Sequence, residues 1–246
     1  MVDTVCRRGK ADDTIGEPGR RRRAGAVTYT FNFRDVFAAW EFLADGLALT
    51  LLLSGVTIVA GFVIGTLCAA GRVHGPPWLR LAIATYVEAI RNTPLIVQLF
   101  LVFFGLPSAG IKFDAVTASL IALTINLGAY TSEIVRAGIE AIPRSQIEAG
   151  AAMGLSGVQI FRYIVLFPAL KIIYPALASQ FVLLMLATSI VSQISAPDLF
   201  HAASIVQSRT FRDFEIYAVV AGAYLALALI FRLILAAIYQ LVFVRR

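Results

Sequence analysis

Long apolar stretches dominate this sequence and alternate with short polar segments. A helix needs about 20 mostly apolar residues to cross the hydrocarbon core of a membrane. Five stretches are of that kind, at about 46–71, 81–106, 115–135, 172–196 and 216–242. A single 246-residue soluble core has no room for five such buried helices. The pattern therefore predicts an all-α integral membrane protein with five transmembrane helices.

Composition agrees with a lipid environment. Hydrophobic residues make up 59% of the chain and charged residues only 15%, whereas soluble domains usually carry about 25% charged residues. Half of the net charge of +6 comes from residues 1–26, which hold seven Lys/Arg and four Asp/Glu. We expect this polar tail to be disordered and the functional protein to begin near Val27. The rest of the chain is too weakly basic to suggest a nucleic-acid partner.

The basic residues of the short loops predict the orientation. If the amino end is outside, eight Lys/Arg fall in the inside segments and four in the outside segments from residue 27 onward. Counting the tail would reverse this balance, but a disordered end is a poor guide to topology. We therefore expect an outer segment at 27–45 and a cytoplasmic carboxyl end.

One polar segment, 133–171, has a regular pattern that distinguishes it from a plain loop. Two stretches fit a capping box, in which a serine and the residue three positions later cap each other's backbone, namely 145–148 and 156–159. Gly154 lies between them and suits a left-handed turn. The segment predicts two short helices that meet at a glycine.

The second of these helices is expected to run through Arg162. Pro168 and Pro175 should then break or bend the chain where it re-enters the membrane. A hairpin with so few side chains at its turn lets another protein's backbone come close. An ordinary interfacial hairpin without a partner fits the same residues equally well.

The residues of this hairpin also resemble a known motif. Glu148-Ala-Gly-Ala-Ala-Met-Gly154, continuing to Pro168, resembles the "EAA" loop of permeases of bacterial ABC importers. Glu88-Ala-Ile-Arg-Asn-Thr-Pro94 resembles the second span of the polar amino acid branch, the histidine/glutamine/arginine type. Further stretches similar to that branch are 97–100, 128–133, 136–138, 141–146, 189–192, 197–199 and 209–212. The resemblance covers about 46–244.

This resemblance implies a type I, MetI-like permease domain at 46–244, whose coupling loop, 143–168, lies on the cytoplasmic side. It further implies a dimeric membrane core with a second permease subunit, the same or a related chain, two ABC ATPase subunits and an extracytoplasmic solute-binding protein. The residues expected at the ATPase contact are Glu148, Ala149, Gly150, Ala151, Gly154 and Arg162. The chain has no phosphate-binding Gly-x-x-x-x-Gly-Lys-Ser/Thr motif, so we expect no cofactor here and ATP bound by the partner ATPase.

Polar side chains within the spans are candidates for the substrate pathway. They are Glu88, Arg91, Asn92, Gln98, Asn126, Tyr130, Gln180, Ser189 and Gln193. Ionisable residues at such depth usually pair or face a cavity, so an ion pair with neighbouring spans is the alternative for Glu88 and Arg91. Glu133 and Arg136 have the same spacing, and structural pairing or docking is expected for them.

Three other functions are alternatives to an amino acid permease. An ABC permease for an opine, a polyamine or another small amine would share most of these motifs. A secondary transporter would show internal repeats with matching broken helices, and the five spans are unlike one another. A membrane enzyme would need a catalytic or metal constellation, but the only histidines, His74 and His201, fall on opposite sides of the membrane in this topology. We therefore expect no catalytic and no metal site.

Overall fold

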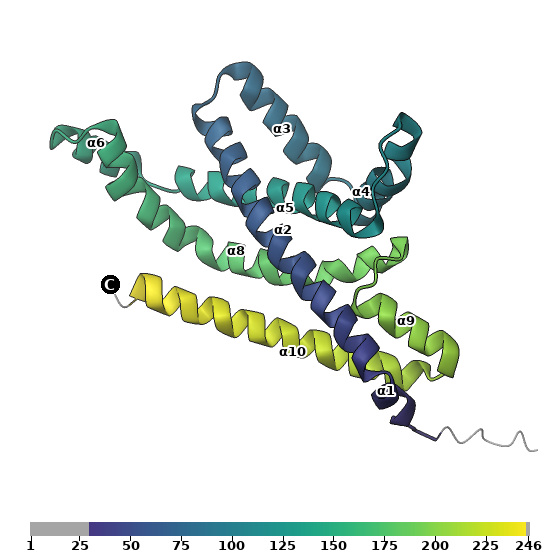
Figure 1. Cartoon of the computed structure of the whole chain (residues 1–246). Helices are drawn as coiled ribbons and strands as arrows, with labels where there is room; N and C mark the ends of the chain where they lie inside the picture. The colour runs from purple at the N-terminus through teal and green to yellow at the C-terminus, as the bar shows by residue number, and fades with distance from the viewer. Residues whose placement is uncertain (1–29, 245–246) are drawn as a thin grey trace, which may run out of the picture. The chain divides into compact units, whose positions relative to one another are not determined.

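A computed structural model describes residues 30–244, and every regular element within that range is a helix. The α-helices are α1 Arg34–Ala38, α2 Trp40–His74, α3 Pro77–Arg91, α4 Leu95–Phe100, α5 Ala115–Glu140, α6 Arg144–Ala152, α7 Gly157–Gln159, α8 Phe167–Ala187, α9 Leu199–Thr210 and α10 Asp213–Tyr239 (Figure 1). Short π-helical and 3-10 turns extend four of them, at Leu101–Gly105, Leu106–Ala109, Ile160–Leu166, Thr188–Ile194 and Gln240–Val244. The expected tail, 1–26, lies outside the described residues.

The helices confirm an integral membrane architecture. Four helical segments are long and apolar enough to cross a membrane: Trp40–His74, Ala115–Glu140, Gly157–Ile194 and Asp213–Val244. A fifth span exists if Pro77–Arg91 and Leu95–Ala109 are taken together, but the chain bends by 108° between these two helices. The second span predicted at about 81–106 is divided by this break, which the sequence analysis did not anticipate. Pro94 disfavours the helical conformation at Thr93, and the chain turns there.

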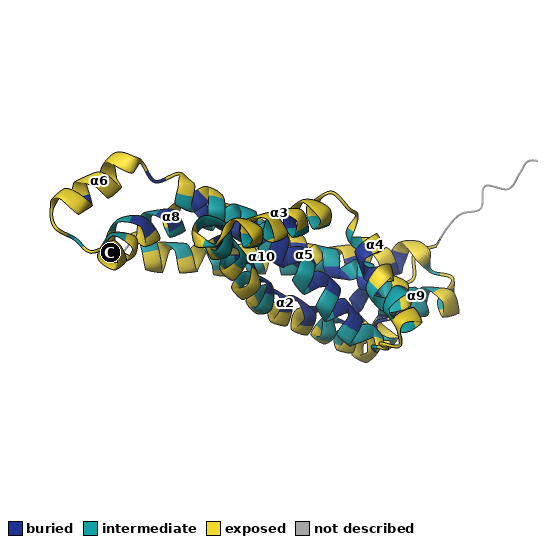
Figure 2. Cartoon of the chain, turned by 90° about the horizontal axis from the view of Figure 1, so that it is seen from above, coloured by how far each residue is buried: buried dark blue, intermediate teal, exposed yellow. Residues whose placement is uncertain are grey.

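The centre of the fold is the packing of α2 against α5, and both helices carry buried residues along their contact (Figure 2). Small residues allow this close approach. A Cβ at Gly65 would lie 2.7 Å from the carbonyl oxygen of Gly128, and one at Gly61 would lie 2.8 Å from the Leu127 side chain. Without a hydrophobic force between helices in lipid, such close packing supplies the attraction.

The hairpin between α5 and α8 differs from its prediction in two places. The box at 156–159 is confirmed, because Ser156 caps the Gln159 backbone and Gln159 caps Ser156. The box at 145–148 is wrong: Pro143 is the N-cap, so the helix already includes Ser145 in its first turn. The second helix also does not end at Arg162. It continues through a π-helical turn into α8, which passes through Pro175 as one helix.

The two ends of the bundle have separate hydrophobic clusters. At one end, buried residues of α1, α2, α9 and α10 pack together, among them Val36, Leu43 and Ile216. At the other end, Phe167 at the start of α8 lies 5.4 Å from Phe243, between ring centroids. The end of α2 also reaches this second region, where His74 meets Phe161 at 6.5 Å. The α5–α8 hairpin and the last described residues therefore lie at the same end of the fold.

A buried carboxylate organises the α9 end. Asp198 caps α9 by accepting the His201 backbone N–H at 2.9 Å, and its other oxygen accepts the Tyr224 hydroxyl at 3.3 Å. The Thr50 hydroxyl of α2 accepts the backbone N–H of Leu199, the first residue of α9, at 3.2 Å. Burial raises the pKa of the Asp198 carboxyl, and its hydrogen bonds only partly offset that effect. This carboxylate thus ties α9 to α10.

Candidate functional site

The break between α3 and α4 is held by one glutamine. The Gln98 amide nitrogen donates to the carbonyl oxygens of Ile90 and Thr93, at 2.7 and 3.0 Å, and so satisfies backbone groups freed at the break. Its amide oxygen accepts from Asn126 of α5 at 2.9 Å. Because both side chains are buried, the bend is anchored to the centre of the fold rather than left as a loose loop.

A cavity of about 540 Å³ opens at this break. Its polar lining comes from three parts of the fold: the break itself, α5 and α8. These polar residues are Arg91, Asn92, Thr93, Asn126, Tyr130 and Gln180, and the rest of the lining is apolar. The structure thus brings together five of the nine predicted pathway residues. Thr93 was missed, because no sequence pattern indicated that the helix would stop beside it.

Arg91 supplies the charge of this cavity. Its guanidinium lies over the Tyr130 ring, 5.5 Å from the centroid. The alternative of an ion pair between Glu88 or Arg91 and neighbouring spans is wrong for residues 30–244, where neither side chain forms a salt bridge. Glu88 instead accepts from the Asn92 amide at 2.9 Å. Arg91 therefore lines the cavity, and Glu133, the carboxylate that interacts with it electrostatically, is not among the described lining residues.

The other predicted pathway residues lie elsewhere. Gln98 and Glu88 act beside the cavity, through the contacts described above. Ser189 lines a different pocket, beside Phe200 and Tyr217 of α9 and α10. Gln193 is exposed, and its amide makes only a long contact of 3.4 Å with Ser192. These two polar residues of the 3-10 turn after α8 therefore do not line the cavity at the break, although Ile190 of the same turn does.

Glu133 and Arg136 form the structural ion pair that was expected. Arg72 of α2 adds a 2.7 Å bond to Glu133, and Glu140 pairs with Arg136 from the next turn. This network joins the ends of α2 and α5 next to the hairpin. Its charges are satisfied within the chain, which favours a bracing role over contact with a ligand.

The hairpin presents an exposed face with a small-residue turn. Glu148, Ala149, Ala151, Gly154 and Arg162 are exposed, in agreement with a contact surface. Gly150 is not part of that surface. It is buried against the following π-helical turn, and a Cβ there would lie 2.4 Å from the Ile164 side chain.

Two apolar side chains that sequence reasoning missed stand out on the hairpin. Met153 is 72% exposed and Val158 is 77% exposed, on either side of Gly154, which has φ +79°. Exposed apolar residues around a polar helix pair are typical of a protein–protein contact. Only the folded hairpin shows that these two side chains point away from the bundle.

A helical membrane core with a broken span, a polar cavity and an exposed hairpin defines a transport protein of the permease class. The chain belongs to the family of binding-protein-dependent transport system inner membrane components, whose pattern matches residues 61–244. The chain is similar to the probable amino-acid ABC transporter permease YckA of Bacillus subtilis, with 35% identity over 212 residues, 86% of this chain and 92% of the relative. It is also similar to the glutamine transport system permease GlnP of Escherichia coli, with 33% identity over 83% of this chain and 94% of that protein.

Solved structures show the same fold. An amino acid ABC transporter, crystallised with histidines, superposes with a TM-score of 0.81 and 35% identity, over 86% of this chain and 99% of that one. The methionine ABC transporter MetNI, in an inward-facing conformation, matches at a TM-score of 0.70 with 21% identity, over 83% of this chain and 98% of its own. The latter likeness supports the permease fold alone.

Proposed function

We propose that this chain is the permease subunit of an ATP-driven, binding-protein-dependent importer of polar amino acids. One observation carries the proposal, namely the cavity at the break of the second span, where Arg91 meets the amides of Asn92 and Asn126. Irregular backbone at membrane depth is tolerated only where it is buried in protein or lines a cavity. An ionisable residue within a span indicates a functional site by default, and Arg91 lines the cavity.

The polar groups of the cavity suit a zwitterion. The Arg91 guanidinium offers donors for an α-carboxylate. Asn92 and Asn126 use their amide nitrogens on Glu88 and Gln98, which leaves both amide oxygens as acceptors for an ammonium group. Thr93, Tyr130 and Gln180 complete the polar lining. One cation and several neutral amides therefore match a neutral or polar amino acid.

The same lining disfavours a polyamine. Recognition of two or more ammonium groups needs carboxylates, and none of the described residues that line the cavity is acidic. An opine retains carboxylates and is not separated by this argument. The charge of the cavity thus argues against a polyamine as the substrate and leaves an amino acid or an opine.

The partners follow from the family and the exposed hairpin. We propose that the hairpin is the coupling helix, that it seats in a groove of one of two ABC ATPase subunits, which bind the ATP, and that a second permease chain, the same or a related one, completes the pathway. An extracytoplasmic solute-binding protein delivers the substrate. In this arrangement the chain itself catalyses no reaction and holds no cofactor. It spans the bacterial inner membrane with its amino end outside and its carboxyl end cytoplasmic.

Uptake by the reconstituted transporter tests the substrate class. Vesicles holding the permease, its ATPase and its binding protein should import histidine or glutamine, and excess histamine or 4-aminobutanamide, the corresponding amines without the α-carboxylate, should not compete. Arg91→Gln should lower the affinity of the cavity for substrate about tenfold or more, the effect of losing a charge-assisted hydrogen bond. Arg91→Lys should retain part of the activity. Equal import of the decarboxylated amines, or an unaffected Arg91→Gln variant, would overturn the proposal.

A further inference from the structure

A second arginine lies within a span and has no use in the proposed pathway. Arg232 is in the middle of α10, twelve residues before Val244, and its side chain is exposed. Within residues 30–244 its guanidinium has no hydrogen-bond or ion-pair partner. A cation held in a span needs an anion, so that anion must come from outside the described residues.

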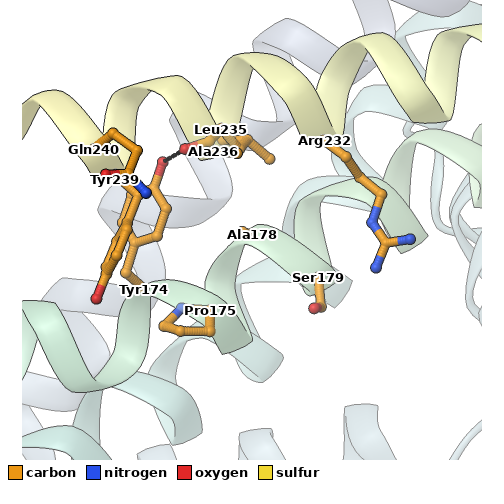
Figure 3. Close-up of a pocket in the computed structure, with 9 residues that line it drawn as sticks. All are labelled: Tyr174, Pro175, Ala178, Ser179, Arg232, Leu235, Ala236, Tyr239 and Gln240. Atoms are coloured by element: carbon orange, nitrogen blue, oxygen red, sulfur yellow. Dashed lines mark hydrogen bonds between the residues drawn. The ribbon is translucent and has the colours of Figure 1, made fainter.

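Arg232 borders a pocket of about 280 Å³ between α8 and α10. Figure 3 shows its guanidinium extending toward the level of Ser179 of α8, while Tyr239 and Gln240 lie at the opposite end of the pocket. The Tyr174 hydroxyl of α8 donates to the Leu235 carbonyl oxygen of α10 at 2.6 Å and so links the two helices beside the pocket. The Ser179 hydroxyl and the Gln240 amide, like Arg232, have no partner among the described residues. The pocket therefore offers three sets of free donors.

The exposed face of α10 is ordered from apolar to polar. Leu225, Leu229, Arg232 and Gln240 recur at helical spacing on one face, and all four are exposed. The leucines come first, the cation follows, and the amide lies nearest the chain end. A lipid whose tail contacts the leucines and whose headgroup contacts Arg232 and Gln240 has the same order of polarity.

The depth of the site fits a lipid of the cytoplasmic leaflet. The span Asp213–Val244 has 32 residues, which is about 48 Å of helix and close to the full bilayer with its headgroups. Arg232 lies about 18 Å of helix from the Val244 end, too deep for its stem alone to reach the surface. The pocket continues from Arg232 to Gln240 past a mostly apolar lining, and these two polar side chains stand at its ends. Basic pockets between helices on the cytoplasmic side bind anionic lipid headgroups.

We propose that Arg232 and Ser179 bind the phosphate of an anionic phospholipid, with its acyl chain along Leu225 and Leu229 and the polar substituent of its headgroup toward Gln240. The assignment to the cytoplasmic leaflet rests on the proposed topology. Binding itself does not depend on the transported substrate. A lipid at this place would hold α8 and α10 together on the side where the two helices have no other neighbour.

Native mass spectrometry of the full-length permease in neutral detergent tests this proposal. The probes are phosphatidylglycerol, phosphatidylcholine and inorganic phosphate. Arg232→Gln should weaken retention of phosphatidylglycerol about fivefold, the effect of one basic contact with an anionic lipid, whereas Arg232→Lys should keep most of it. Lys171→Gln is the matched control, because Lys171 is an exposed cation of α8 that does not line the pocket. It should bind as the unaltered chain does.

Several outcomes would overturn the proposal. Equal losses in Arg232→Gln and Lys171→Gln would show a diffuse basic surface. Equal retention of phosphatidylcholine, or displacement by inorganic phosphate, would show that no anionic lipid is selected. If Arg232→Gln instead separated permease dimers and left lipid retention unchanged, the anion would belong to a second chain. None of these results bears on amino acid transport, since neither ATPase nor substrate is present.

Discussion

Replacing Gly154 tests whether the hairpin transmits the work of an ATPase. Gly154 adopts φ +79°, and a Cβ built on it would meet nothing within 4 Å. A side chain there costs about 1 kcal/mol of backbone strain, because the left-handed conformation disfavours any residue with a Cβ. That strain lowers the population of the native turn about fivefold and leaves the membrane bundle untouched. Any larger loss of function must therefore arise at a partner surface.

Gly157 provides the matched control. It lies three residues away in the same hairpin, also has open space around its Cβ position, and has no left-handed conformation. Gly157 is the first residue of α7, and the negative charge of an aspartate is favourable at a helix N-terminus. Gly154→Asp and Gly157→Asp thus add the same side chain to the same exposed hairpin, but only the first strains the backbone at the turn.

Reconstituted transport supplies the readout for this pair. Both variants should insert into the membrane in normal amounts. Gly154→Asp should abolish uptake, with the ATPase either dissociated or hydrolysing ATP without response to the loaded binding protein, whereas Gly157→Asp should retain most activity. Near-normal uptake in Gly154→Asp would refute the coupling assignment. Equal defects in the two variants would refute the argument from backbone strain.

Three further predictions concern the fold. A reporter fused after Arg246 should report the cytoplasm and one inserted in 197–214 the outside, and the reverse pattern would contradict the proposed topology. Gly65→Ala should destabilise the chain by about 1–3 kcal/mol through overpacking against α5, whereas Gly55→Ala on the same helix, with open space at its Cβ, should be neutral or stabilising in thermal unfolding. Asp198 has a raised pKa, so its contribution to stability is present below the unfolded value of about 3.9 and is lost as the pH rises through the folded value. The melting temperature of the unaltered chain should therefore fall as the pH rises above about 4, and that of Asp198→Asn should fall less steeply. If the two melting temperatures changed with pH in parallel, a group other than Asp198 would be responsible.

The sequence by itself determined the membrane class and most of the helices. Apolar length is sufficient for that conclusion, because a lipid environment leaves few structures other than helices for an uncharged stretch such as 46–71. Local signals were also reliable where they concern only neighbouring residues: the capping box at Ser156, the left-handed Gly154 and the Glu133–Arg136 pair all appear in the structure. The motif resemblance indicated the permease family, to which the chain belongs.

Only the tertiary structure decided which polar residues converge. The break at Thr93 is stabilised by Gln98 and by Asn126, which is 28 positions further along the chain, so no local pattern contains it. Gly150 looked equivalent to its small neighbours, yet packing against Ile164 buries it. The capping box predicted at Ser145 does not form, because the helix begins earlier, after Pro143. The pocket beside Arg232 is formed with α8, which is more than fifty residues away in the sequence. Periodicity reports the face of one helix, whereas the partner of that face depends on how distant helices pack.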